Sequence, residues 1–193
     1  ALVKQAHPRW SPVQMKAAIM NTAGHDLFTG PDQTGDRYGP ARVGAGRVDA
    51  LAAVQTQLLA YASDASGAVS ASFGVVEAPI QRDKVTRIKR VRIQNKGNAA
   101  AELSASYDGI VSQPGVSYQV QPSTVTVLAH GSTIVRVVMT VIPGQLRKTI
   151  DPTMATSQTD PLAGFDRARQ FISDASGRLV ISQTGQPDLR VPV

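Results

Sequence analysis

The sequence predicts a mixed fold, with short α-helices over the first third of the chain and an antiparallel β-sandwich over the rest. Apolar residues recur at helical spacing up to about residue 61, and beyond residue 67 they alternate with polar residues. Turn-forming residues then interrupt the chain at short intervals, with no long helical stretch between them. Many short strands separated by turns are typical of an antiparallel sandwich.

The start of one helix is predicted at Ser11. Ser11 is the expected N-cap, Pro12 tolerates the first helical position, and Gln14 is placed to complete a capping box. Trp10 and Met15 lie at the spacing of a hydrophobic staple, which would fix the angle at which the chain enters the helix.

A second helix is expected to end before this one begins. Residues 1–6 have helical character, and Pro8 disfavours helical geometry in the residue before it. The two helices should therefore meet at a tight corner formed by residues 7–10.

A third helix is predicted over residues 48–61, with Asp49 as its N-cap and a polar linker, residues 63–67, after it. Four apolar side chains would share one face of this helix: Leu51, Val54, Leu58 and Tyr61. An apolar surface that needs cover should be formed by six residues of these helices: Trp10, Val13, Ile19, Leu51, Val54 and Leu58. We expect either self-association of the chain or helices folded back on the sandwich.

Twofold alternation predicts the strands of the sandwich. They are centred on residues 85–93, 103–107, 116–120, 125–127, 135–141, 170–172, 179–181 and 189–191. Turns are predicted between them at residues 95–98, 108–109, 114–115, 130–132, 143–144 and 174–177. The connection over residues 143–169 is long for a sandwich, and a helical turn is expected within it at residues 146–151.

Lysine and arginine are concentrated in residues 84–92, where they alternate imperfectly with Val85, Ile88 and Val91. This pattern favours a strand with one buried face, a charged outer face and a bulge. The chain has a net charge of +6, but no aromatic residue lies in this run to stack on bases. We therefore predict no nucleic-acid partner, while an acidic surface or a wall polymer stays open as a partner.

Composition excludes several kinds of chemistry. The chain has no cysteine, so disulfides, thiolate catalysis and zinc–cysteine sites are excluded. No apolar run approaches the length of a membrane span, so no membrane insertion is predicted. With 193 residues, of which 42% are hydrophobic, the chain can build a globular core.

No catalytic, cofactor or metal site is predicted within the chain. His7, His25 and His130 are scattered and are given structural roles, because no serine-nucleophile motif accompanies them. Residues 44–46, Gly-Ala-Gly, are interpreted as a tight turn rather than a phosphate site. Residues 32–36 lack the ligand pattern of a calcium loop.

Two segments resemble a known family. Residues 1–12 resemble the stretch that follows the active-site serine in subtilisin-like serine proteases (subtilases), through Ala1, Leu2, Lys4, His7, Pro8, Trp10, Ser11 and Pro12. Residues 38–54 resemble the G-x-G-x-(V/I)-(D/N)-A element that closes the subtilase catalytic domain. The strand order that follows is similar to the fibronectin type III-like domain of larger secreted subtilases.

This resemblance implies a division of the chain into three parts. Residues 1–62 would be the last helices of a subtilisin-like α/β catalytic domain, residues 63–67 a linker, and residues 68–193 a fibronectin type III-like sandwich. The catalytic triad would lie upstream of Ala1, so the parent would be a serine endopeptidase and this fragment alone inactive.

The resemblance also implies partners and a location. The partners would be the upstream catalytic domain and the protein substrates of a secreted or cell-surface bacterial enzyme. Subtilases often bind calcium, which would belong to the catalytic domain, and no cofactor is expected for this chain. Two other functions stay open: a non-catalytic module that binds substrate protein or a cell-wall polymer, and a structural spacer.

Overall fold

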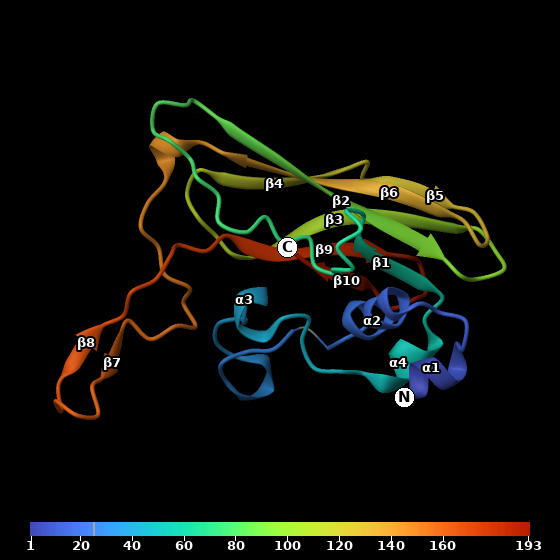
Figure 1. The fold of residues 1–193 in the computed structure, drawn as a ribbon, viewed down its shortest axis with the longest axis horizontal. Helices are drawn as coiled ribbons and strands as arrows, with labels where there is room; N and C mark the ends of the chain where they lie inside the picture. Colours follow the sequence, from blue (N-terminus) through green and yellow to red (C-terminus); the bar gives the residue numbers. More distant parts are fainter. Residues whose placement is uncertain (25) are drawn as a thin grey trace.

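The computed structural model describes residues 1–24 and 26–193 (Figure 1). Four short α-helices precede the sandwich: α1 (Leu2–Ala6), α2 (Pro12–Asn21), α3 (Pro40–Val43) and α4 (Ala50–Gln55). Two 3₁₀ turns are η1 (Pro31–Gln33) and η2 (Pro143–Gln145). The strands are β1 (Leu58–Ala62), β2 (Val85–Asn95), β3 (Ala101–Val111), β4 (Val116–Gln121), β5 (Thr124–Val127), β6 (Ser132–Val141), β7 (Ser157–Thr159), β8 (Asp166–Ala168), β9 (Ser176–Ser182) and β10 (Leu189–Pro192).

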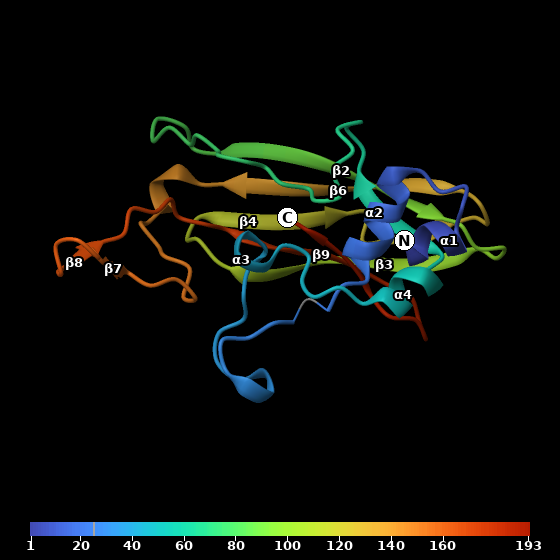
Figure 2. The same cartoon turned by 60° about the horizontal axis from the view of Figure 1, so that its bottom comes forward.

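Eight strands form two four-stranded antiparallel sheets. The first has the order β1-β2-β6-β4 and the second the order β10-β9-β3-β5, and their layers are seen from another side in Figure 2. Alternate residues of both sheets point into one shared core, as the twofold pattern predicted. The core contains Val91, Ile93, Val135 and Val137 from the first sheet and Leu103, Ala105, Leu179, Ile181 and Val191 from the second. The predicted all-β sandwich class is therefore confirmed.

Strand β2 differs in one respect from its prediction. Its pairing with β6 runs without a register shift from Val85 to Gln94, so the expected bulge is absent from this ladder. Ile88 consequently points away from the core and is 47% exposed, while Val85 and Val91 are buried. The imperfect alternation in the sequence marks an apolar residue on the outer face rather than a bulge.

The predicted helix over residues 48–61 is wrong in its second half. Helix α4 ends at Gln55, and Thr56 has an extended backbone. Leu58–Ala62 then forms β1, which pairs with β2. Most residues of this strand are apolar. Over so short a segment, the apolar face of a helix and a strand buried on both faces produce the same sequence pattern, so the pattern could not distinguish them.

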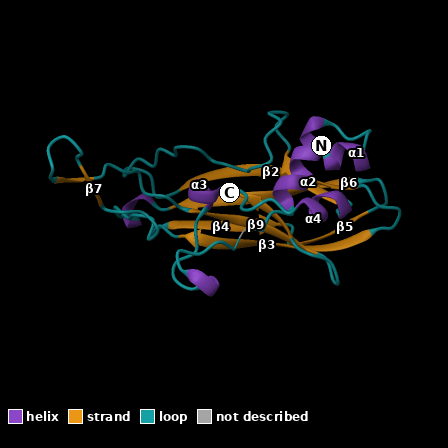
Figure 3. Cartoon of the chain, turned by 90° about the horizontal axis from the view of Figure 1, so that it is seen from below, coloured by secondary structure: helices purple, strands orange, loops and turns teal. Residues whose placement is uncertain are grey.

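Four more predictions in the second half of the chain are corrected. No strand forms at residues 170–172; the hairpin β7–β8 forms earlier, on an arm that stands away from the sandwich (Figure 3). Residues 146–151 form no helical turn, because the backbone becomes extended at Leu146, directly after η2. The predicted turn at residues 108–109 lies inside β3, where a bulge interrupts the pairing with β9. The predicted turn at 174–177 ends early, since β9 begins at Ser176.

Two tyrosines stack between the sheets. Tyr107 of β3 and Tyr118 of β4 have ring centroids 4.5 Å apart, and the Tyr118 hydroxyl donates a 2.7 Å hydrogen bond to the Ala175 carbonyl. Burial raises the pKa of Tyr118 to about 12 from an ordinary value of 10.0, and it raises the pKa of Tyr107 as well.

This pair predicts a loss of stability at high pH. Above pH 10.0, tyrosines of the unfolded chain lose protons that the folded chain retains until about pH 12. The free energy of unfolding should therefore be unaffected by the pair below pH 10.0 and fall as the pH rises through this window. Urea unfolding at several pH values measures this slope. Tyr118→Phe should have a shallower slope, and an unchanged slope would contradict the assignment.

Candidate functional site

The first helical corner is built around His7. Its ring lies parallel to Trp10, with centroids 3.8 Å apart, and its Nε2 lies 2.8 Å from the Val54 carbonyl of α4. The capping box of α2 is present: the Ser11 hydroxyl accepts from the Gln14 amide, and the Gln14 side chain accepts from the Ser11 amide. His7 thus connects α1, α2 and α4, which agrees with its predicted structural role.

His130 gives no catalytic pair within the described residues. His130 is exposed in the turn between β5 and β6, as predicted, with a left-handed backbone (φ 57°). His25 lies outside the described residues. Within residues 1–24 and 26–193, neither His7 nor His130 hydrogen-bonds a serine or a carboxylate. The location of the triad upstream stays a prediction.

The helices pack onto the sandwich at one side. Helix α2 contacts the edge strands β1 and β10, and Trp10 is 9% exposed. The apolar cluster between helices and strands contains Val3, Trp10, Ala17, Ala18, Ala53, Leu59 and Val69. The helices are therefore folded back on the sandwich, which is one of the two expected ways to cover the apolar surface. Leu51 nevertheless stays 66% exposed.

Asn21 joins this helical part to both sheets. It is the last residue of α2, and its side chain is fully buried. Its Oδ1 accepts a 2.8 Å hydrogen bond from the Ala60 amide of β1, and its Nδ2 donates a 3.2 Å bond to the Arg190 carbonyl of β10. One amide side chain therefore satisfies backbone groups on the edges of both sheets.

A cluster of charges fastens the segment after α2 to the outer face of the second sheet. Arg37 donates a bidentate pair of hydrogen bonds to Asp108 of β3, at 2.8 and 2.7 Å. These bonds raise the pKa of Arg37. Asp26 lies 3.3 Å from Arg37 and 3.2 Å from Arg190 of β10. No sequence motif predicts this cluster, because its members are up to 164 residues apart.

Arg178 of β9 is the most deeply buried member of the cluster. Its side chain is 1% exposed, and its guanidinium forms no hydrogen bond within the described residues. Asp26 is 3.8 Å away, and Asp108, directly opposite in the ladder, already binds Arg37 with both oxygens. Burial consequently lowers the pKa of Arg178.

Two loops considered in the sequence have structural explanations. Gly44 and Gly46 both have positive φ, 57° and 107°, and form the tight turn after α3, as predicted. Residues 32–36 lie in a hairpin closed by the Phe28–Arg37 bridge. No group of three or more potential metal ligands forms within the residues that the structure describes.

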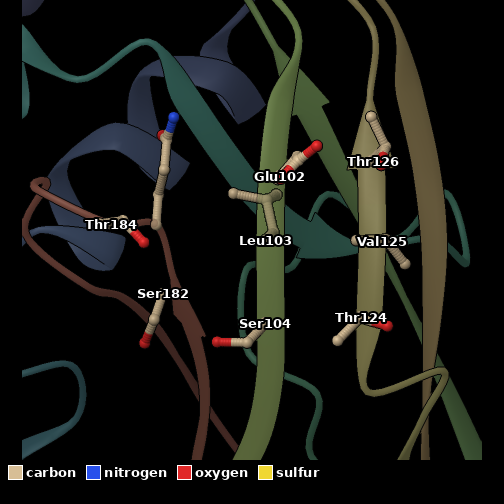
Figure 4. Close-up of a pocket in the computed structure, with 9 residues that line it drawn as sticks. Glu102, Leu103, Ser104, Thr124, Val125, Thr126, Ser182 and Thr184 are labelled. Carbon is tan, nitrogen blue, oxygen red and sulfur yellow. The ribbon is translucent and has the colours of Figure 1, made fainter.

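A polar groove crosses the outer face of the second sheet (Figure 4). Its volume is about 510 Å³, and Ser104 of β3 points towards the strand that carries Ser182. Ser104 pairs with Ser182 on one side and with Thr124 on the other, so hydroxyl groups form a row across three strands. Glu102 provides one carboxylate. The groove is suited to hydrogen bonding with a polar ligand.

The arm that carries β7 and β8 exposes apolar side chains. Leu162 at its turn is 98% exposed and Phe165 is 53% exposed. Arg167 lies over the Phe165 ring at 5.1 Å and pairs with Asp160 at 2.8 Å. The long connection predicted at residues 143–169 therefore projects from the sandwich and has apolar side chains at its tip.

Comparisons with known proteins add little. No protein-family model and no curated protein matches the chain. A solved structure of a FixG-related protein from Vibrio parahaemolyticus is similar over 70% of this chain and 90% of its own length, with 9% sequence identity and a TM-score of 0.37. A similarity this low carries no argument about function. No helix in the described part of the chain is long and apolar enough to cross a membrane.

Proposed function

We propose that this chain is the C-terminal part of a secreted or cell-surface subtilisin-like serine endopeptidase. The upstream part would contain the aspartate, histidine and serine that cleave peptide bonds by acyl-enzyme chemistry. The observation that carries the proposal is the match of residues 1–12 to the subtilase pattern, in a segment that folds as two helices with His7 stacked on Trp10.

In this proposal the sandwich supports catalysis without performing it. Helix α1 would be the far end of the helix that begins at the catalytic serine, so its position affects the nucleophile. Packing of α1 against α2 and α4, and of α2 against β1 and β10, would connect that helix to the sandwich. Removing the sandwich should then lower stability and activity together.

The upstream sequence of the native protein tests the proposal directly. We expect Gly-Thr-Ser-Met-Ala-x-Pro about fifteen residues before Ala1, with the aspartate and histidine motifs earlier. The chain alone should not cleave a casein substrate, whereas a polypeptide that includes the upstream part should. A natural N-terminus at Ala1, or an unrelated upstream domain, would refute the proposal.

A binding module is the second candidate function, and the groove on the second sheet favours it. Its hydroxyl row suits a polar polymer or a peptide from a substrate protein. Binding of the chain to immobilised polysaccharide and to immobilised casein would be compared for wild type and Ser104→Leu. Weaker binding of the variant to one matrix would support this function, and equal binding would contradict it.

A further inference from the structure

Three arginines lie together on the outer face of the first sheet, beside the part at β1 that the helices cover. Arg90 and Arg92 of β2 share this face with Arg136 of β6. Arg90 and Arg136 are directly opposite each other in the ladder, and both are exposed. Like charges in this position repel each other, so the pair lowers the stability of the isolated chain.

Within the described residues, no carboxylate pairs with these three arginines, and the nearby Asp64 pairs with Lys89 at 3.8 Å. Strands β2, β4 and β6 contain no aspartate or glutamate. Elsewhere in the described residues, Arg37, Arg167 and Arg190 each lie within 3.3 Å of an aspartate oxygen. The side chains of Arg90 and Arg136 form no ion pair or hydrogen bond among the described residues, and the Arg92 side chain donates to the Ser132 hydroxyl. The arginine face is therefore an uncompensated positive surface.

Apolar side chains are interleaved with the charges. Ile88 is 47% exposed and is opposite Val138, and Ile134 is opposite Arg92. Arginine is enriched at protein interfaces, whereas nucleic-acid surfaces combine cations with aromatic residues that are free to stack on bases. Tyr61, which is opposite Arg92, is instead packed against the helices and bonded to Gln94. The mixture indicates a partner with both acidic and apolar side chains.

We infer that the arginine face, composed of Arg90, Arg92, Arg136, Ile88, Ile134 and Val138, is a docking surface for an acidic polypeptide with apolar residues. Such a partner would bring carboxylates to Arg90 and Arg136 and cover Ile88 and its neighbours. The net charge of +6 would assist association at low salt. This inference does not depend on the proposed protease.

Binding to four defined polymers tests the inference: a random glutamate–leucine copolymer, polyglutamate, heparin and double-stranded DNA. The copolymer should bind most tightly, and its binding should weaken as the salt concentration rises. Arg90→Gln/Arg136→Gln should weaken its binding about tenfold, since two charged contacts are lost. Arg9→Gln/Arg42→Gln, which removes the same net charge from other exposed sites, should change binding less than about twofold.

Stability and a third variant separate the outcomes. The Arg90/Arg136 variant should be at least as stable as wild type, because the repulsion between the two arginines is removed, so lost binding cannot reflect unfolding. Ile88→Ser should weaken binding of the copolymer but not of heparin. Equal or tighter binding of heparin or DNA, or an equal effect of the control variant, would overturn the inference.

Discussion

Gly177→Ala should destabilise the fold by about 3 kcal/mol. Gly177 is buried near the start of β9, opposite Gly109 of β3. A methyl group there would overlap the Asp108 carbonyl oxygen and lie 2.7 Å from the Tyr107 hydroxyl oxygen. The first of these is a backbone atom, so the methyl group cannot be accommodated by a side-chain rotation. The strands β3 and β9 would have to separate, and urea unfolding would measure the cost.

Gly144→Ala is the matched control for this substitution. Gly144 is exposed in η2, and a methyl group there would have no atom within 4 Å. Its free energy of unfolding should stay within about 0.5 kcal/mol of wild type. Equal stability of the two variants would show that β3 and β9 do not approach as closely as the structure has them.

Gly177 also illustrates which parts of the fold the sequence could predict. Alternation identified β3, β4, β5 and β6, because the inward side chains of these strands are less exposed than the side chains between them. It could not show that Gly177 faces Gly109, since strand pairing depends on contacts between distant residues. The start of β9 was therefore interpreted as a turn from its Ser-Gly pair.

The error at residues 58–61 has a different cause. Leu58 and Tyr61 continue the helical spacing of α4, but the backbone turns to an extended conformation at Thr56. Pairing of β1 with β2 and burial under α2 outweigh local helix propensity there. Local propensity succeeded where the signals are local: the capping box of α2 lies within four residues and was predicted completely.

The charged contacts of the site could not be predicted at all. No regular spacing in the sequence relates Asp26 to Arg190, or Arg37 to Asp108, because only folding brings these residues together. The arginine face was visible only in part: the run at residues 84–92 marked its β2 side, and Arg136 joined it through the ladder with β6.

Asn21→Ala should separate the helices from the sandwich and cost about 3 kcal/mol of stability. The substitution removes two hydrogen bonds and leaves the buried Ala60 amide without an acceptor, and each such group costs about 1–3 kcal/mol. Hydrogen exchange at the Ala60 amide should accelerate more than exchange in the central strand β6, because α2 would open locally before the sheets unfold.

Asn98→Ala provides the control, since Asn98 is exposed in the turn between β2 and β3. Its stability should stay within about 0.5 kcal/mol of wild type. If Asn21→Ala also left the free energy of unfolding unchanged, Asn21 would not hold the helices to the sheets. The proposed connection between the sandwich and the helix of the upstream nucleophile would then lose its central contact. If only Asn21→Ala destabilises, the same variant in a polypeptide with the upstream part should lose peptidase activity at temperatures where the wild type remains active.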